Sequence, residues 1–317
     1  MDMDKIRNEP RILVEVPLKP VQGTRFQPTG FPDLGAATYT LADGKQMLLV
    51  ESAQSMANRM EEVCWDNSKE ELVEKLKGLP YVISTLPDGS KTNSILEAHR
   101  INSPYIYNTK EFDSIKKEIG FEKNKPFNRK KLVDALLKYD INSLIHGIFL
   151  EKIGGVVRIP RVLSGFVEAS NVTIAPSGGA KFDRIQPVTT GDSTPYGKAK
   201  DGYGNVIFHR DEFTGEITAY FNIDVSQIRG YGFDEKVEDL LLLLAFYKIR
   251  KLLDEGLRLR TACDLEVSGE ITVKCPEGFR LPSLDDLEKK IPGYIDKCGD
   301  HFATPRITEV LYTGGKK

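Results

Sequence analysis

The 317-residue sequence predicts a mixed α+β fold, and three patterns support this prediction. Apolar and polar residues alternate over residues 11–18, which is typical of a strand with one buried face. Apolar residues recur at helical spacing over residues 51–65, and residues 235–255 have a nearly continuous apolar middle that indicates a buried helix. Because no internal repeat or long linker divides the chain, we expect one elaborated domain over residues 1–317.

The first part of the chain is predicted to form a strand, an irregular loop, a hairpin and a helix. Pro and Gly interrupt residues 19–37, so this segment should turn repeatedly. Residues 39–41 and 47–50 fit a hairpin. The helix within residues 51–65 should place one face on the core, and its other face carries Gln54, Ser55, Asn58, Arg59 and Glu62. These polar groups either contact a polar ligand or simply bind water and cap loops.

The middle of the chain is predicted to alternate between helices and short strands. We expect helices at residues 68–76, 92–100, 110–119 and 129–138, and strands at residues 81–85 and 105–107. Residues 116–131 contain seven basic and two acidic side chains. This basic segment is either a solvated charged face or a contact surface for RNA.

The second half is predicted to contain a strand, a long projecting loop and a second hairpin. The strand covers residues 162–174, the loop covers residues 177–204, and the hairpin joins residues 205–212 to residues 216–224 around Phe213-Thr214-Gly215. Loops this long are usually functional or disordered. Asp234 should cap the main core helix, which ends at Gly256. Strands near residues 265–266, 271–274 and 306–312 and a helix at residues 284–291 should complete the chain.

Composition and charge exclude several classes of protein. The 44 basic and 46 acidic residues leave a formal net charge of −2, which excludes a wholly basic nucleic-acid binder but allows a local basic track. The longest apolar run, at residues 240–247, is far shorter than the roughly 20 residues that cross a bilayer. The acidic N-terminus has no secretory apolar run, so we expect a cytoplasmic protein with no membrane partner. Cys64, Cys263, Cys275 and Cys298 lack paired spacing and should be reduced thiols.

The sequence contains none of the common nucleotide-binding or hydrolase signatures. Residues 191–199 resemble a phosphate-binding loop but have the wrong spacing, and no two histidines stand at the helical spacing of a metal site. A lone histidine such as His146 is more often structural than a ligand. Asp33 lies in the Pro- and Gly-rich loop, where aspartate commonly stabilises a turn. We therefore predict no metal site and no cofactor.

The remaining residue types suit contact with single-stranded RNA. Arginine and lysine can bind phosphate, side-chain amides can bind 2′-hydroxyl groups, and planar side chains can stack on bases. The loops also contain Phe26 and Phe31, which we expect to be exposed. These features alone support RNA binding only weakly.

Five strings in the sequence resemble a known family. They are PVQGTRFQPTGFPDLGAA (residues 20–37), LLVESAQSMANRMEEVCWD (residues 48–66), SILEAHRINSPYI (residues 94–106), HGIFLEK (residues 146–152) and RVLSGFVEASNV (residues 161–172). Over nearly its whole length the chain resembles the CRISPR-associated RAMP backbone subunit of type I-G, formerly I-U, effector complexes.

The resemblance implies a modified RRM-like, ferredoxin-like RAMP fold with large insertions and a protruding thumb, for which residues 175–225 are the candidate. It also implies that several copies pack head to tail along a CRISPR RNA within a Cascade-like antiviral complex, together with other Cascade subunits. The guide would then recognise target DNA by base pairing, while the protein holds the RNA backbone.

We place the expected RNA contacts from side-chain chemistry and location. The candidates are Arg25, Gln27, Gln54, Asn58, Arg59, Arg158, Arg161 and Lys181. Backbone subunits of type I complexes are not nucleases, so the resemblance implies no catalytic residue. The alternative is a type III-like RAMP subunit that cleaves target RNA with a metal ion, in which Asp33 would be the first candidate. A third possibility, a small-molecule enzyme, predicts a monomer with a deep pocket.

Overall fold

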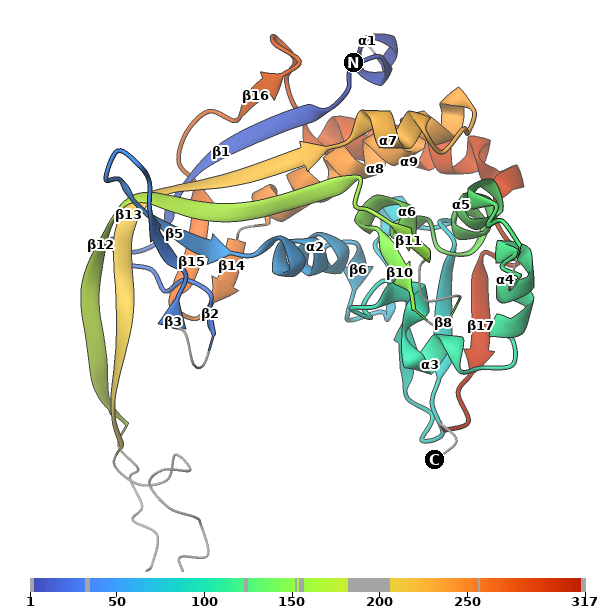
Figure 1. The fold of residues 1–317 in the computed structure, drawn as a ribbon, viewed down its shortest axis with the longest axis horizontal. Coiled ribbons are helices and arrows are strands. Elements are labelled where there is room, and N and C mark those ends of the chain that lie inside the picture. The colour runs from blue at the N-terminus through green and yellow to red at the C-terminus, as the bar shows by residue number, and fades with distance from the viewer. Residues whose placement is uncertain are drawn as a thin grey trace, which may run out of the picture.

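The computed structural model describes residues 3–31, 35–122, 125–151, 153, 157–181, 206–255 and 257–314. An antiparallel eight-stranded sheet in the order β14-β15-β1-β13-β12-β5-β4 forms its centre, and β16 pairs with β1 (Figure 1). Its strands are β1 (Ile12–Pro20), β4 (Thr38–Thr40), β5 (Gln46–Glu51), β12 (Leu163–Lys181), β13 (Val206–Ile223), β14 (Leu257–Arg260), β15 (Cys263–Val267) and β16 (Thr272–Cys275). The predicted α+β class is therefore confirmed.

A second lobe is built on the three-stranded sheet β17-β8-β9. Its strands are β8 (Tyr81–Thr85), β9 (Lys91–Asn93) and β17 (Ile307–Leu311), and its helices are α3 (Pro104–Tyr107), α4 (Phe112–Ile119), α5 (Arg129–Tyr139) and α6 (Ile141–His146). The C-terminal strand β17 runs parallel to β8, so the end of the chain returns to an early segment. One hydrophobic core joins this lobe to the central sheet.

The other elements connect or cover these two sheets. They are α1 (Met3–Arg7), α2 (Ala53–Glu62), α7 (Val225–Arg229), α8 (Glu235–Asp254), α9 (Leu284–Lys297), β2 (Gly30–Phe31), β3 (Gly35–Ala36), β6 (Trp65–Asp66), β7 (Glu71–Leu72), β10 (Ile148–Leu150), β11 (Val157–Ile159) and the 3-10 turns η1 (Glu74–Leu76), η2 (Arg100–Asn102) and η4 (Gly299–His301). In the described ranges, no helix has both the length and the apolar character needed to span a membrane.

The core lies between the central sheet and its helices. Alternate residues of β1, from Ile12 to Leu18, are buried, as the strand pattern predicts. Helix α2 packs on β12, and α8 contacts both α2 and β13. The side chain of Asp234 accepts a hydrogen bond from the Val237 amide at 3.2 Å, so the predicted cap of the main core helix is confirmed. The four cysteines are free thiols, also as predicted.

Strands β12 and β13 form one long hairpin that extends away from the central sheet (Figure 1). Two predictions were wrong here. Residues 177–181 belong to β12, not to a loop, and residues 206–223 form one strand without a turn at Thr214. The reason is long-range pairing, because Thr214 lies opposite Thr173 and β12 supplies backbone partners on both sides of Gly215. The rest of the loop predicted at residues 177–204, from residue 182 on, lies outside the described residues.

Three local predictions for residues 68–107 were also wrong. Residues 68–76 form β7 and η1, and residues 92–100 begin in β9, which pairs with β8; neither segment is a regular helix. Residues 105–107 are helical and not extended. Ser103 caps this helix by accepting a hydrogen bond from the Tyr105 amide at 3.3 Å, and Pro104 occupies its first turn.

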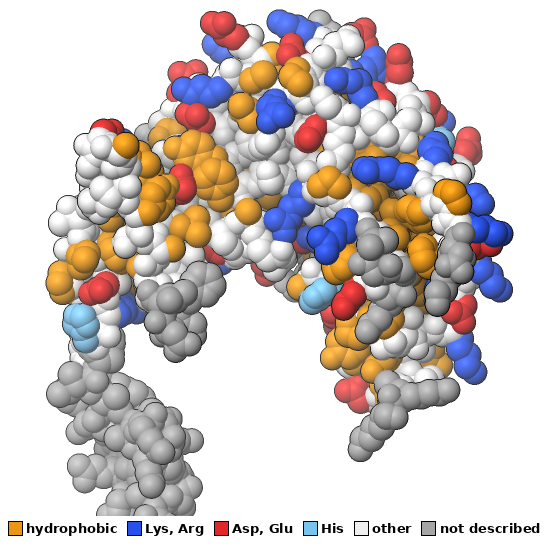
Figure 2. Space-filling model, in the orientation of Figure 1, with side chains coloured by type: hydrophobic (Ala, Val, Ile, Leu, Met, Phe, Trp, Pro, Cys, Tyr) orange, Lys and Arg blue, Asp and Glu red, His pale blue; other side chains and the backbone are white. Residues whose placement is uncertain are grey.

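The central sheet, the second lobe and the β12–β13 hairpin enclose a broad concavity, which we call the concave underside (Figure 2). The β12–β13 hairpin bounds it on one side, the second lobe bounds it on the other, and α2 lies along its roof in the orientation of Figure 1.

Candidate nucleic-acid interface

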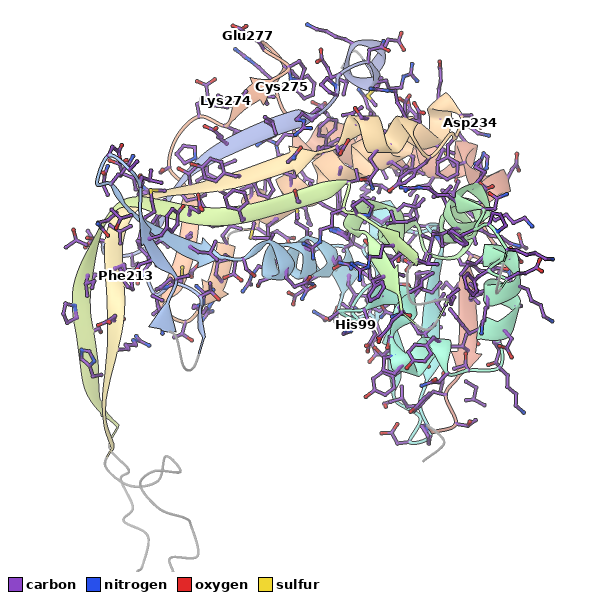
Figure 3. The ribbon with its side chains drawn as sticks, viewed as in Figure 1. His99, Phe213, Asp234, Lys274, Cys275 and Glu277 are labelled. Atoms are coloured by element: carbon purple, nitrogen blue, oxygen red, sulfur yellow. The ribbon has the colours of Figure 1, made fainter. Side chains whose placement is uncertain are left out.

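A cleft of about 680 Å³ lies between α2 and the β10–β11 hairpin, and we call it the α2–β11 cleft. The side chains that can bind a ligand here come from segments far apart in the sequence. The lining residues with polar, charged or aromatic side chains are Gln54, Asn58, His99, Arg100, Asn102, His146, Phe149, Glu151, Arg158 and Arg161. His99 lies on the side of the second lobe that faces the concave underside (Figure 3).

Helix α2 supplies two of the side-chain amides that line the cleft. Ser52 caps the helix by accepting a hydrogen bond from the Ser55 amide, so the first turn is fixed. Gln54 and Asn58 are four residues apart and therefore share one face of the helix. Gln54 donates a hydrogen bond to Asn58 at 3.2 Å and accepts one from Arg161. The polar helix face predicted from the sequence thus lines a cleft.

The opposite wall of the cleft carries two arginines. The Arg158 guanidinium lies 4.2 Å from the centre of the exposed Phe149 ring, in a cation–π contact that holds it on the surface. Among the described residues, neither Arg158 nor Arg161 forms an ion pair with a carboxylate. Burial, with a further contribution from the charge of Arg100, lowers the pKa of Arg161. Both cations therefore remain available to an anion.

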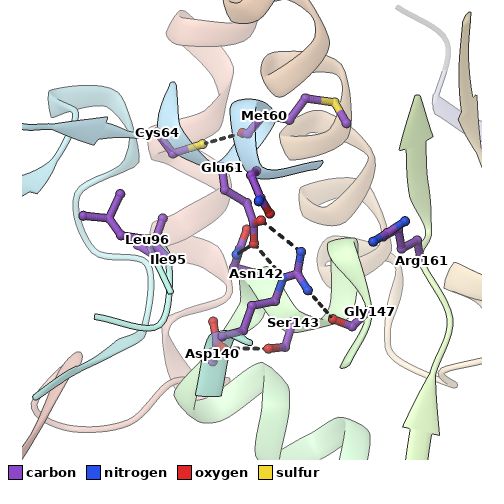
Figure 4. A network of polar contacts seen from close by, with 12 residues as sticks. Met60, Glu61, Cys64, Ile95, Leu96, Asp140, Asn142, Ser143, Gly147 and Arg161 are labelled. Carbon is purple, nitrogen blue, oxygen red and sulfur yellow. Dashed lines mark hydrogen bonds and ion pairs between the residues drawn. The ribbon is translucent and has the colours of Figure 1, made fainter. Parts of the chain in front are cut away.

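Below the cleft lies a buried polar network (Figure 4). Arg100 donates to both carboxylate oxygens of Glu61, at 2.6 and 2.9 Å, and to the Gly147 carbonyl at 3.2 Å. Asn142 donates to Glu61 at 2.5 Å and accepts from the ammonium of Lys248 at 2.9 Å. Because each charge has a partner, the network can hold the floor of the cleft in one arrangement.

Gly147 allows the floor to fold tightly onto β11. Its φ of +75° is in the left-handed range, and a Cβ atom there would lie 2.6 Å from the Ile159 carbonyl oxygen. The Val162 amide also donates to the Ile145 carbonyl at 2.9 Å. These contacts bring Arg161 next to the end of α6, where His146 stands.

A second group of polar side chains, which we call the arginine track, begins on another face of α2. It consists of Arg59, Arg260, Arg210 and Arg25, with Glu51, Gln27 and Glu212 between them. Around Glu51, Arg59 lies 3.7 Å from the carboxylate and Arg260 forms an ion pair with it. Arg59 also donates to the Leu259 carbonyl at 2.5 Å.

The far half of the track surrounds Glu212 at the base of the β12–β13 hairpin. Arg210 lies 2.8 Å and Arg25 lies 3.6 Å from this carboxylate, and Arg210 also donates to the Gln27 side chain at 3.4 Å. Glu51 and Glu212 are buried, whereas the Arg25 side chain is 53% exposed. Two buried carboxylates therefore position four arginines, of which Arg25 and Arg210 are the more exposed.

The structure brings the predicted contact residues into two adjoining groups. Gln54, Asn58, Arg158 and Arg161 line the cleft, and Arg25, Gln27 and Arg59 belong to the track. Lys181 ends β12, but its side chain lies outside the described residues, as do Asp33 and the Phe31 side chain.

The prediction that Phe26 is exposed and could stack on a base was wrong. Phe26 is fully buried, because its amide and carbonyl pair with Phe213 and draw the side chain into the core. Sequence reasoning also missed Arg210 and Arg260, since only the pairing of distant strands places them beside Gln27. No local pattern marked either residue. In the described ranges, no group of three or more His, Cys, Asp and Glu side chains could hold a metal ion.

Comparisons with known proteins identify a family. Residues 12–174, just over half of the chain, match the sequence model of a family described as "CRISPR-associated protein GSU0053". No curated protein matches the chain. Among solved structures, the chain is similar to one from a "CRISPR RNA-guided surveillance complex, pre-nicking", with 11% identity, a TM-score of 0.38 and coverage of 92% of this chain and 89% of the other. It is also similar to Csc2 of Thermofilum pendens, with 14% identity, a TM-score of 0.32 and coverage of 94% and 80%.

Proposed function

This chain belongs to the family of CRISPR-associated protein GSU0053, and from that premise we propose that it is a guide-RNA-binding backbone subunit of a Cascade-type antiviral complex. One observation supports this function most directly. Four side chains chosen for RNA chemistry, Gln54, Asn58, Arg158 and Arg161, line a single cleft although they come from two distant segments.

The side chains of the concave underside suit the sugar–phosphate backbone of an RNA strand. The α2–β11 cleft offers the two amides of α2 and two arginines that lack carboxylate partners in the described structure, and the track adds four positioned arginines. Cations recognise phosphate on every nucleotide, so such a surface binds RNA without reading its sequence. Sequence recognition of target DNA would then come from pairing with the guide.

We propose the finer features of the family resemblance on the same basis. The antiparallel central sheet with helices against one face would be the modified RRM-like core, and the long β12–β13 hairpin would be the thumb. Several copies would pack head to tail along one CRISPR RNA beside other Cascade subunits, and a heterologous contact of this kind generates a filament. We place the complex in the cytoplasm and in subtype I-G.

We further propose that the subunit is not an enzyme and needs no cofactor. The alternative, metal-dependent cleavage of target RNA, makes a distinct prediction about Asp33. Assembled complex should be incubated with complementary RNA and Mg²⁺, alongside the Asp33→Ala variant. Intact RNA in both samples supports the noncatalytic function, whereas site-specific cuts that disappear in the variant would replace it with the nuclease.

The binding function is tested by native purification. The protein should be isolated from cells that express its cognate CRISPR array, and the co-eluting nucleic acid should be measured at 260 nm and sequenced. We expect RNA of discrete length that contains spacer sequence. A solitary protein without bound nucleic acid would contradict the proposal.

A further inference from the structure

The floor of the α2–β11 cleft contains a buried histidine without a hydrogen-bond partner in the described part of the chain. His146 is the last residue of α6, its side chain borders the cleft, and the residue is only 1% exposed. Neither ring nitrogen has a hydrogen-bond partner among the described residues. A buried polar group without a partner is costly, so such a group at the edge of a cleft points to a ligand.

The surroundings of His146 determine which form of the ring is present. Burial, followed by the positive charges of Lys248, Arg100 and Arg161, lowers its pKa well below the usual value. The ring is therefore neutral near pH 7, and a neutral imidazole offers one donor and one acceptor. It would not serve as a third cation for phosphate.

The ligand group should match these hydrogen-bonding properties and should recur along a guide of any sequence. Base edges differ from one nucleotide to the next, and phosphate is an acceptor that the two arginines already suit. The ribose 2′-hydroxyl is present on every ribonucleotide, both donates and accepts a hydrogen bond, and is absent from DNA.

We propose that the α2–β11 cleft binds one ribose–phosphate unit of RNA, with the 2′-hydroxyl on His146 and the phosphate between Arg158 and Arg161. This inference rests on the proposed function, because it assumes that the bound polymer is RNA. The hydrogen bond between Arg161 and Gln54 lies in the lining of the same cleft and joins two side chains that are not buried. Both can exchange this hydrogen bond for bonds to the ligand.

The test compares two strands that differ only at the 2′ position. Fluorescence anisotropy should measure binding of the full chain to a labelled single-stranded RNA and to the same sequence made with 2′-deoxynucleotides that keep uracil. The variants are His146→Leu, which removes both polar atoms, and His146→Gln, which keeps a donor and an acceptor. The matched control is His301→Leu, since His301 lies beside Asp234 and outside the lining of the cleft.

Wild type and His301→Leu should bind RNA about two- to tenfold more tightly than the 2′-deoxy strand, as expected for one hydrogen bond. His146→Leu should lower this ratio toward one, and His146→Gln should retain more of it. Because His146 has no hydrogen-bond partner among the residues that the structure describes, His146→Leu should not lower the Tm.

An unchanged ratio in His146→Leu would overturn the inference and leave the proposed function intact. An unchanged ratio with a lowered Tm would assign His146 a purely structural role. A wild-type protein that bound neither strand would contradict the proposed function itself.

Discussion

Removal of the two cleft cations should weaken RNA binding in a way that depends on salt. In the Arg158→Gln/Arg161→Gln double variant, both side chains keep hydrogen-bonding capacity but lose their charge. Because neither arginine has a carboxylate partner among the described residues, the change removes positive charge without leaving a buried anion unpaired. The loss should therefore appear mainly as lost phosphate contacts.

The expected magnitude follows from counterion release. Each phosphate neutralised on a single strand contributes about 0.7 to the slope of log affinity against log salt, so loss of the one phosphate held between the two arginines should lower the slope by about 0.7. Between about 50 and 200 mM salt, the ratio of wild-type to variant affinity should therefore fall by about 2.6-fold. The difference between the proteins should be greatest in low salt.

The assay is a salt titration of binding to a single-stranded RNA. Lys289→Gln/Lys290→Gln is the matched control, because it removes the same charge from two exposed residues of α9, away from the cleft and the track. We expect the control to keep a slope close to that of wild type. Equal slopes for the cleft variant and wild type, or an equal decrease in the α9 variant, would refute the assignment of phosphate contacts to the cleft.

Three further predictions concern the scaffold that supports the site. Glu61→Leu leaves Arg100 buried without its carboxylate and should cost about 3–5 kcal/mol in urea unfolding, so a loss below about 1 kcal/mol would contradict the importance of the buried pair. Burial raises the pKa of Asp140 from 3.8 to about 6, so the folded state holds this proton more tightly than the unfolded chain. The unfolding free energy of wild type, relative to Asp140→Asn, should therefore fall by about 3 kcal/mol as the pH rises from about 4 to above 6; a difference independent of pH would refute the raised pKa. Phe26→Ala should cost about 3–5 kcal/mol because the ring is buried, whereas an exposed stacking platform would leave the thermal stability nearly unchanged.

The parts of the fold that follow local patterns could be predicted from the sequence. The alternation in β1 and the apolar middle of α8 depend on which face is buried, and both predictions hold. Segments decided by distant partners could not be predicted. Strand β13 continues through Gly215 because β12 lies beside it, and residues 91–93 extend because β8 pairs with them.

In the candidate site, too, residues placed by a local pattern could be predicted and residues placed by distant partners could not. The polar face of α2 was visible in the sequence, because helical spacing places Gln54 and Asn58 together. Arg210 and Arg260 were not visible, since their positions depend on long-range strand pairing and on the buried Glu212 and Glu51. His146 was predicted to be a structural residue with hydrogen bonds, but the described structure gives it no partner.

The central claim is that RNA lies against the α2–β11 cleft and the arginine track. The most direct measurement is ultraviolet crosslinking of the natively purified complex, followed by mass spectrometry of the peptides that carry nucleotide adducts. We predict adducts on peptides from α2, the β10–β11 hairpin and the segment around Arg25. Adducts confined to α9 and β16, with none on these peptides, would contradict the account.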